Sequence, residues 1–309
     1  MPDLFPDGVL VIDKPEGPTS HDIVAVARRV MHGKKVGHTG TLDPLASGVL
    51  PLVLGKATRL AQFLSAAEKT YVAELALGRS TTTFDRAGAG VPREGARPVA
   101  DVTRSDIDAA VDRFRGSYLQ PPPPFSAKKI DGDRAYDLAR RNEPVALQPS
   151  AVTVQALEVI EWEGARLRLR LVCSAGFYVR SLAQAVGEQL GTGAYLNALV
   201  RTASGDFTIE SAVSMADLDR RPEVAAARVI GLDQLLPWLP AVAMTAEGAS
   251  LAAKGGFLSA SHLLDARAMP AAGKVRLLHP DGHLVAIAEP RLSGPSRHLP
   301  FLHPGVVLE

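Results

Sequence analysis

The sequence lacks most of the features that build disulfides, metal clusters and membrane spans. Cys173 is the single cysteine among 309 residues, so the chain cannot form an internal disulfide or a cysteine-rich zinc site. The first ten residues carry acidic side chains and two prolines instead of a basic stretch followed by an apolar one, and we therefore expect no signal peptide. The apolar run Val49 to Leu54 is too short to cross a bilayer. These absences favour a protein of the cytoplasm.

The chain also lacks the excess of positive charge that many nucleic-acid-binding proteins carry. Lys and Arg number 34 against 33 Asp and Glu, which gives a formal net charge of +1. Composition alone therefore does not indicate an RNA partner, and any basic surface must be local. What is present, 46% hydrophobic and 22% charged residues, is ordinary for a globular protein that can bury a sizeable core.

Apolar periodicity and turn residues predict alternating strands and helices. Strands are predicted at residues 8–12, 49–54, 71–77, 152–161, 167–173 and 207–209. Helices are predicted from a cap at Thr19 or Ser20 to Gly33, and at residues 57–64, 105–114, 134–141 and 179–190, the last ending at Gly191. Between them lie a glycine-punctuated loop at 37–48, a long loop at 78–95 and extended prolines at 121–124. Loops of this length usually serve a function, so we expect them to hold a ligand.

Arginine and leucine alternate from Arg166 to Leu171. A strand there would bury its leucines and present its arginines, Arg166, Arg168 and Arg170, on the opposite face. This face could contact an RNA backbone, but a charged face with a period of two is what any half-exposed strand shows. We therefore favour a solvated face.

The residue pattern changes after Pro240, where alanine and glycine become frequent. Residues 274–278 and 283–288 flank the turn Pro280-Asp281-Gly282 and predict a hairpin. The change predicts a small β-rich domain from about residue 240. His279 and His283 lie four positions apart across this turn instead of on one helix face, so the sequence predicts no metal pair there.

The segment most informative about chemistry runs from Gly37 to Leu50 and reads GHTGTLDPLASGVL. Its glycines allow a bulky ligand to approach the backbone closely, and Pro44 biases Asp43 towards an extended conformation that aims its side chain outward. On local features alone, Asp43 could instead serve only to cap a turn.

This segment resembles the motif of the TruB family of tRNA pseudouridine-55 synthases. Further blocks match in the family's order at residues 8–17, 69–71, 116–132, 135–140, 173–182 and 199–207. Two positions depart from the pattern. Thr82 stands where an acidic residue is common, with Asp85 close by, and Phe177 stands where threonine is frequent.

The resemblance implies that Asp43 is the catalytic aspartate, that Arg180 pairs with it and that Tyr71 stacks on the target base. Pseudouridine formation breaks the N1–C1′ bond, turns the uracil and rejoins it through C5, so the base must leave its stack and stay enclosed. An aromatic platform returns about 1 to 3 kcal/mol of stacking, and an arginine keeps a carboxylate charged and oriented. Whether Asp43 adds to the ring, adds to the sugar or acts as a base at C2′ is open at this point.

The same resemblance implies that Tyr178 shapes the pocket, that Leu199 packs its wall and that His38 fills the space that the base vacates in the T-loop. Each of these residues also has a purely structural reading. Tyr178 and Leu199 could be ordinary core residues, His38 a hydrogen-bonded loop histidine and Arg180 a surface residue at a helix start.

The resemblance further implies a mixed α/β (α+β) pseudouridine synthase fold over residues 1–239, with a long, mostly antiparallel sheet and flanking helices. A small β-barrel-like PUA domain that binds RNA would follow over residues 240–309. The substrate would be the T-arm of tRNA, with uridine 55 as the target, recognised by loop shape and splayed bases. We expect a cytoplasmic monomer that needs no guide RNA, metal, organic cofactor or membrane.

Two other functions fit the same residues. The chain could act mainly by binding tRNA and assisting its folding, in which case Asp43→Asn would keep tRNA affinity and the folding effect. It could also be a guide-dependent synthase subunit, which would be inactive on naked tRNA. Nothing in the sequence supplies the extended basic tails that such subunits can carry.

Overall fold

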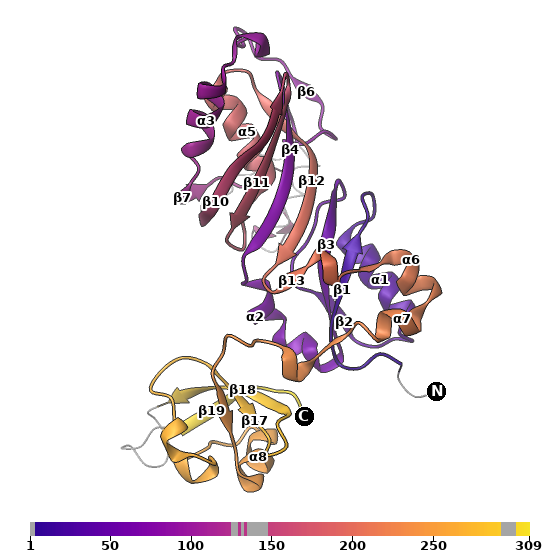
Figure 1. The fold of residues 1–309 in the computed structure, drawn as a ribbon, viewed down its shortest axis with the longest axis vertical. Helices are drawn as coiled ribbons and strands as arrows, with labels where there is room; N and C mark the ends of the chain where they lie inside the picture. Colours follow the sequence, from indigo (N-terminus) through magenta and orange to yellow (C-terminus); the bar gives the residue numbers. More distant parts are fainter. Residues whose placement is uncertain (1–3, 125–128, 131–132, 135–147, 292–300) are drawn as a thin grey trace.

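The computed structural model describes residues 4–124, 129–130, 133–134, 148–291 and 301–309. A large mixed sheet with helices packed on it forms most of the molecule, and a smaller β-rich part follows at the C-terminal end (Figure 1). The helix predicted at 134–141 lies outside the described residues except for Arg134, which ends a short strand. The parts of the matching blocks at 125–128, 131–132 and 135–140 also lie outside them. Within the described part, no helix is long and apolar enough to cross a membrane.

The large sheet has eleven strands. They are β1 (Gly8–Lys14), β2 (Val36–His38), β3 (Ala46–Leu54), β4 (Lys69–Leu77), β7 (Gly116–Gln120), β10 (Ser150–Glu163), β11 (Arg166–Cys173), β12 (Ala194–Ser204), β13 (Phe207–Thr208), β14 (Val213–Ser214) and β15 (Ile230–Gly231). Two short pairs lie outside it, β5 (Ser80–Thr81) with β6 (Gly90–Val91) and β8 (Lys129–Ile130) with β9 (Asp133–Arg134).

The helices of this part are α1 (Ser20–Val30), α2 (Ala61–Ser65), α3 (Arg104–Asp112), α5 (Val179–Leu190), α6 (Met215–Arg220) and α7 (Pro222–Ala226). Short 3-10 turns occupy Gly55–Leu60, Val99–Asp101, Ile209–Ser211 and Leu232–Gln234. Helices α3 and α5 lie against β10, β11 and β4, whereas α1, α6 and α7 lie beside β1 (Figure 1). The sheet is therefore flanked by helices, as predicted.

The strand order is β14-β1-β3-β12-β4-β11-β10-β7. Strand β12 lies at the centre, where it pairs parallel with β3 and antiparallel with β4. Among the described pairs of this sheet, only β3–β12 and β1–β14 are parallel. The predicted mixed fold with a mostly antiparallel sheet is thus confirmed.

Local sequence signals explain where α1 begins and where α5 ends. Thr19 caps α1: its Oγ1 accepts from the Asp22 backbone N–H at 3.2 Å, and the Asp22 carboxylate accepts from the Thr19 backbone N–H at 2.8 Å. Helix α5 ends at Gly191, whose φ of 75° is the left-handed conformation that glycine adopts without steric cost. Both boundaries agree with the prediction.

The alternation in β11 also has the predicted consequence. Leu167, Leu169 and Leu171 are fully buried against the helical layer, whereas Arg166 and Arg170 are exposed. Residues of α1, α3 and α5 complete the same hydrophobic core.

The C-terminal part has its own four-stranded sheet, in the order β16-β17-β18-β19. Its elements are β16 (Ala241–Ala243), α8 (Ala246–Ala253), β17 (Val275–Leu278), β18 (Leu284–Arg291) and β19 (Phe301–Val307), with 3-10 turns at Ala260–His262 and Ala266–Ala268. The predicted hairpin is present as the antiparallel pair β17–β18. The assignment of this part as a PUA-like RNA-binding domain over 240–309 stays a prediction.

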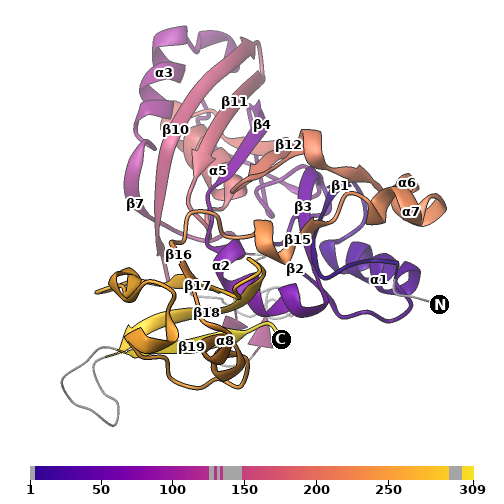
Figure 2. The ribbon, with the colours of Figure 1, turned by 60° about the horizontal axis from the view of Figure 1, so that its bottom comes forward.

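A second hydrophobic cluster joins this part to the large sheet. Leu284 and Ile287 of β18 pack together with Val9 of β1, Val53 of β3 and Leu60. Figure 2 shows the C-terminal strands lying close to α2 and the lower end of the large sheet. Shared apolar burial therefore holds the C-terminal part against the rest of the molecule.

Some sequence predictions were wrong in detail, and several strands, β7 and β12 among them, were not predicted. Residues 57–64, predicted as one helix, form a 3-10 turn followed by the short helix α2. The strand predicted at 207–209 ends at Thr208. No strand was predicted over β12, although it is the central strand. Bulges between Leu196 and Ala198 and between Arg201 and Ala203 interrupt the alternation that identifies a strand in sequence.

Candidate active site

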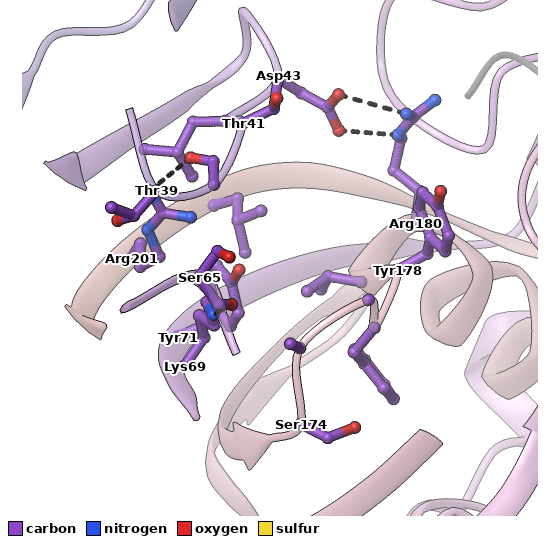
Figure 3. Close-up of a pocket in the computed structure, with 17 residues that line it drawn as sticks. Thr39, Thr41, Asp43, Ser65, Lys69, Tyr71, Ser174, Tyr178, Arg180 and Arg201 are labelled. Carbon is purple, nitrogen blue, oxygen red and sulfur yellow. Dashed lines mark hydrogen bonds and ion pairs between the residues drawn. The ribbon is translucent and has the colours of Figure 1, made fainter. Parts of the chain in front are cut away.

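A cavity of about 290 Å³ opens between the loop at 39–43, the start of β4, the start of α5 and β12 (Figure 3). Five of the six residues singled out in the sequence line it: Asp43, Tyr71, Tyr178, Arg180 and Leu199. They come from four separate stretches of the chain. The fold therefore brings together residues that the sequence could only propose one by one.

Asp43 and Arg180 form a two-point ion pair at one side of this cavity (Figure 3). Arg180 Nε donates to Asp43 Oδ2 at 2.8 Å, and Nη2 donates to Oδ1 at 3.2 Å. The Arg180 side chain is 8% exposed, whereas that of Asp43 is 35% exposed. The arginine thus lies behind the carboxylate and fixes its plane, while the carboxylate stays accessible to a ligand.

Asp85 is a second carboxylate near Arg180. Its Oδ2 lies 3.9 Å from Arg180 Nε, and its Oδ1 accepts from Thr83 Oγ1 at 2.6 Å and from the Ala87 backbone N–H at 2.9 Å. Arg180 Nη1 also donates to the Thr83 carbonyl at 3.3 Å. The loop predicted at 78–95 therefore contacts Arg180, and its expected role in holding a ligand stays a prediction. Asp85 supplies a nearby acidic group although Thr82 departs from the family pattern.

The loop that carries Asp43 is fixed by hydrogen bonds on both sides of the aspartate. Ser20 Oγ donates to the Leu42 carbonyl at 3.2 Å and accepts from the Leu42 N–H at 2.9 Å. On the other side, the Gly17 N–H donates to the Pro44 carbonyl at 2.8 Å. Because these partners belong to α1 and to the turn after β1, the loop that carries Asp43 is held in place by neighbouring elements.

Arg201 of β12 is hydrogen-bonded to the same loop and to β3. This side chain is almost fully buried, and it donates from Nε to the Val49 carbonyl at 2.7 Å and from Nη2 to the Gly40 carbonyl at 3.1 Å. Strand β12 approaches β3 so closely that a Cβ on Gly48, which has a φ of 98°, would lie 2.2 Å from the Arg201 carbonyl oxygen. Gly48 is thus required by the close approach of two backbones.

Lys14, at the end of β1, is another buried cation beside the loop. Its Nζ donates to the carbonyls of Ala46 at 2.7 Å and Pro15 at 2.9 Å. Burial lowers the pKa of Lys14, and the nearby Asp43 carboxylate partly opposes that shift. Lys14 therefore ties the turn after β1 to the start of β3.

Tyr71 and Leu199 provide apolar surface inside the cavity. Both are largely buried, and burial raises the pKa of the Tyr71 phenol. A neutral aromatic ring next to an aliphatic wall is suited to hold a flat, uncharged base. This placement agrees with the roles implied for these two residues, which stay predictions.

Lys69 lines the same cavity two residues before Tyr71. Burial, with a smaller effect of Arg201, lowers the pKa of Lys69 to about 8. Its Nζ donates to the carbonyls of Ser65 and Ala67. The cavity therefore has cationic residues at its base and the Asp43 carboxylate at its edge.

Tyr178 lies at the N-cap of α5, next to Phe177, and both line the cavity. The backbone of Tyr178 is held by Gln120 of β7: its N–H donates to Gln120 Oε1 at 2.8 Å, and its carbonyl accepts from Gln120 Nε2 at 3.0 Å. Phe177 in place of the frequent threonine adds apolar surface to this wall.

His38 is the one singled-out residue that does not line the cavity. It ends β2, its Nδ1 accepts from the Gly40 N–H at 3.3 Å, and its ring meets that of His21 edge-on at 5.6 Å. Burial lowers the pKa of His38, and His21 adds to that shift. His38 thus lies just before the Asp43 loop and outside the pocket itself, and its implied role stays a prediction.

Sequence reasoning gave no site role to Lys69, Arg201 or Asp85. Lys69 and Arg201 fall inside matching blocks, so their position beside Tyr71 and Leu199 was the available signal. Asp85 approaches Arg180 only through tertiary packing.

Two of the three arginines on this face of β11 have acidic partners on β10. Arg168 Nη1 lies 3.0 Å from Glu161 Oε2, and Arg166 donates to Glu161 and Glu163. These pairs agree with a solvated face at Arg166 and Arg168, whereas Arg170 is exposed and forms no ion pair within the described part of the chain.

The cavity suits chemistry that uses one carboxylate. Among its described lining residues, Asp43 is the only acid, and no histidine or cysteine accompanies it. Hydrolysis of glycosidic bonds usually employs two opposed carboxylates, which this arrangement does not provide. A single oriented carboxylate next to an aromatic platform fits a reaction in which a base is detached, held and rejoined.

Comparison with known proteins places this site in a family. Residues 28–179 match the TruB family pseudouridylate synthase N-terminal domain, and residues 180–236 match the tRNA pseudouridylate synthase B C-terminal domain. The tRNA pseudouridine synthase B of Solibacter usitatus is 43% identical over 98% of this chain and 100% of its own. That of Geobacillus kaustophilus is 44% identical over 76% of this chain and 84% of its own.

A solved structure has the same fold. A chain in the crystal structure of a Cbf5–Nop10–Gar1 complex superposes with a TM-score of 0.73 at 26% identity, over 99% of this chain and 86% of that one. Its similarity extends over both the large sheet and the C-terminal part. The chain therefore belongs to the TruB family of tRNA pseudouridine synthases, isomerases that convert uridine in tRNA to pseudouridine.

Proposed function

We propose that the enzyme isomerises uridine 55 in the T-loop of tRNA, acting alone and without a guide RNA. The observation that carries the proposal is the accessible Asp43 carboxylate, held in two places by the buried Arg180 above a pocket that contains Tyr71. The curated relatives named tRNA pseudouridine synthase B support tRNA as the substrate.

Asp43 starts the reaction on the flipped nucleotide. Arg180 engages both oxygens from the buried side, so a lone pair of each remains available towards the cavity. The carboxylate acts either as a nucleophile on the ring or at C1′, or as a base that removes the C2′ proton. In each case the N1–C1′ bond breaks, the uracil turns in place and the new bond forms from C5 to C1′. The C5 proton leaves to solvent and N1 gains a proton, so the product is an isomer of the substrate. Asp43 is regenerated, either by release of its covalent bond or by return of the proton to C2′.

Tyr71, Leu199 and Tyr178 keep the detached uracil from leaving. Tyr71 offers an aromatic face, Leu199 packs the wall and Tyr178 narrows the entrance beside α5. Stacking on a tyrosine contributes about 1 to 3 kcal/mol, which offsets part of the energy needed to unstack the base. These contacts hold the base by shape and leave its edges free to turn.

His38 lies where the remaining T-loop would rest once the base is flipped. It precedes the Asp43 loop by only a few residues, outside the pocket, and burial favours its neutral form. A neutral ring can fill the space left in the loop stack without a charge to desolvate. The C-terminal part, as a PUA-like domain, would contact another part of the tRNA.

Tritium release tests the proposal directly. Unmodified tRNA, or its isolated T-arm, labelled at C5 of uridine is incubated with the wild type or with Asp43→Asn, without metals, cofactors or partner proteins. We expect release by the wild type only, with unchanged tRNA affinity of the variant. A wild type that binds tRNA without releasing tritium would favour the folding-assistance or guide-dependent alternatives and overturn the proposal.

Deuterium at C2′ of the target uridine separates the roles open to Asp43. A primary isotope effect on turnover supports removal of the C2′ proton, because that bond then breaks in a slow step. Absence of an effect under single-turnover conditions supports nucleophilic attack. Substitution of uridine 55 by cytidine is the matched control for position and should abolish release.

A further inference from the structure

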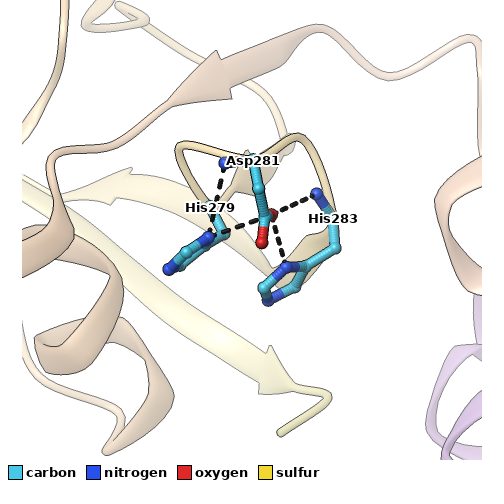
Figure 4. A group of neighbouring side chains, drawn as sticks. All are labelled: His279, Asp281 and His283. Carbon is cyan, nitrogen blue, oxygen red and sulfur yellow. Dashed lines mark hydrogen bonds and ion pairs between the residues drawn. The ribbon is translucent and has the colours of Figure 1, made fainter.

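Three potential metal ligands meet in the turn between β17 and β18, far along the chain from the active site (Figure 4). Asp281 Oδ1 lies 2.9 Å from His279 Nδ1 and 2.6 Å from His283 Nδ1. The two imidazole rings stack with centroids 4.5 Å apart and an interplanar angle of 17°. Both ring nitrogens therefore lie within hydrogen-bond distance of one carboxylate oxygen, which also accepts from the His283 N–H at 3.1 Å, and the three potential ligand atoms lie within 4.8 Å of one another.

The sequence argued against a metal pair because the two histidines straddle a turn. The folded hairpin, however, brings the two histidines side by side. Its backbone is closed by bonds from the His279 N–H to the His283 carbonyl at 2.9 Å and from the Gly282 N–H to the His279 carbonyl at 2.8 Å. Residues at the two ends of such a turn lie side by side, and Asp281 at its tip folds back between them.

The donor set fits a divalent transition metal, and Zn²⁺ in particular. Zinc takes imidazole nitrogen and carboxylate oxygen at about 2.0 to 2.2 Å, which puts tetrahedral ligands roughly 3.4 Å apart. The two nitrogen–oxygen distances here are shorter than that by less than 1 Å. Because all three side chains are partly exposed, a small rotation makes room for the ion, with water in the fourth position.

Glu309 supplies the outer contact that metal-binding histidines commonly have. Its Oε1 lies 2.9 Å from His283 Nε2, on the ring edge opposite Nδ1. A carboxylate that accepts the Nε2 proton leaves the lone pair of Nδ1 for the metal and fixes the ring orientation. The side chain of the last residue in the chain is thus joined to the cluster through His283.

We propose that His279, Asp281 and His283 bind one Zn²⁺ ion, with Glu309 orienting His283. The ion would link the two sides of the β17–β18 turn directly, and Glu309 through His283. Leu284, next to His283, packs in the cluster shared with β1 and β3, and its N–H donates to Asp233 Oδ1 at 2.6 Å. A metal at the turn therefore stabilises the junction between the C-terminal part and the large sheet.

The test uses the full-length protein after treatment with a chelator. Co²⁺ is titrated in while visible absorption is recorded, because tetrahedral cobalt absorbs far more strongly than the hydrated ion, and Zn²⁺ affinity is then measured by competition. The variants are His283→Asn, Asp281→Asn and Glu309→Gln. His32→Asn is the matched control, since His32 is an exposed histidine outside the cluster whose positive φ asparagine tolerates.

We expect one ion per chain, a higher melting temperature with Zn²⁺ than with chelator, and unchanged binding by His32→Asn. His283→Asn and Asp281→Asn should lose the cobalt spectrum, and Glu309→Gln should weaken binding about 10-fold to 100-fold. No tetrahedral cobalt spectrum in the wild type, or equal binding by the wild type and His283→Asn, would overturn the site. Tritium release does not depend on this site, so the outcome is independent of the proposed function.

Discussion

The ion pair at the pocket and the ion pairs between β10 and β11 have opposite surroundings. At the pocket, the Arg180 side chain is 8% exposed and holds Asp43 in two places. At the outer strands, Arg166, Arg168 and Glu161 are 44%, 38% and 37% exposed and pair across β10 and β11. Burial of a charge costs free energy that an exposed pair does not incur.

The difference shows that the two kinds of ion pair contribute to the protein in different ways. An exposed pair contributes little to stability. The free-energy cost of burying Arg180 must be offset by good hydrogen-bond geometry, and the result is a carboxylate held in one orientation. Around the pocket, Lys14, Lys69 and Arg201 are also buried, and each donates to backbone carbonyls. These cations position loops, while Arg180 positions a side chain.

Arg180→Met is expected to give the largest effect. It leaves Asp43 and Asp85 without their cation, so the free energy of unfolding should fall by about 3 kcal/mol and tritium release by at least roughly 100-fold. Denaturant unfolding and single-turnover kinetics measure the two losses. The matched variant Arg168→Met should keep activity, and a similar loss in both would show that burial does not separate the two groups.

Tyr71→Ala should have the next largest effect, on activity. Loss of the stacking platform is worth about 1 to 3 kcal/mol, or roughly 5-fold to 150-fold in kcat/KM. Tyr71→Phe retains the ring and should keep most of the activity, because the phenol hydroxyl has no assigned part in the reaction. An equal loss in both variants would assign the role to the hydroxyl instead.

Lys69→Met tests whether the buried cations at the pocket cost stability. The pKa of Lys69 is about 8 in the folded protein against an ordinary 10.5, so between these values the unfolded chain binds the additional proton. Stability from this group therefore rises with pH across that window, by up to about 1.4 kcal/mol per pH unit.

The measurement compares unfolding free energies of wild type and Lys69→Met at about pH 7 and about pH 10. The wild type should gain relative to the variant at the higher pH. Burial raises the pKa of the Cys173 thiol to about 12 and Lys69 partly opposes that shift, so loss of Lys69 should raise this pKa further and change the difference between the proteins in the same direction. A constant difference between the proteins would mean that Lys69 is not desolvated as the structure indicates.

Glu161→Gln should give the smallest effect, because it breaks only exposed pairs. The free energy of unfolding should change by less than about 1 kcal/mol, and salt should reduce the change further. Thermal unfolding at low and high ionic strength checks this. A loss of stability comparable with that of Arg180→Met would contradict the distinction between the buried and the exposed ion pairs.

Elements governed by neighbouring residues were predicted well. Helix α5 has its apolar spacing and its Gly191 stop in one stretch of sequence, and β11 shows its buried and exposed faces by simple alternation. Strand β12 was missed because its bulges break the alternation and because Arg201, a charged residue, is buried in it. Its position between β3 and β4 is a long-range property that local patterns do not contain.

The candidate site also combines local features, which the sequence shows, with contacts between distant residues, which it does not. The glycines and Pro44 around Asp43 mark an unusual loop in one local segment, and the family motif assigns Asp43 its role. The partner of Asp43, however, lies 137 residues away in Arg180, and the carbonyl of Gly40 is held from 161 residues away by Arg201. Asp85 is brought to Arg180 by the same packing.

The sequence by itself determined the family motif around Asp43, the start of α1, the end of α5 and the two-faced strand, because capping, turn formation and side-chain periodicity act between residues that are close in the chain. Only the tertiary structure decided which charges are buried, which loop holds Arg180 and that His279, Asp281 and His283 converge. Those properties depend on which surfaces exclude water and how strands pair across the sheet, and distant segments settle both only when they pack together.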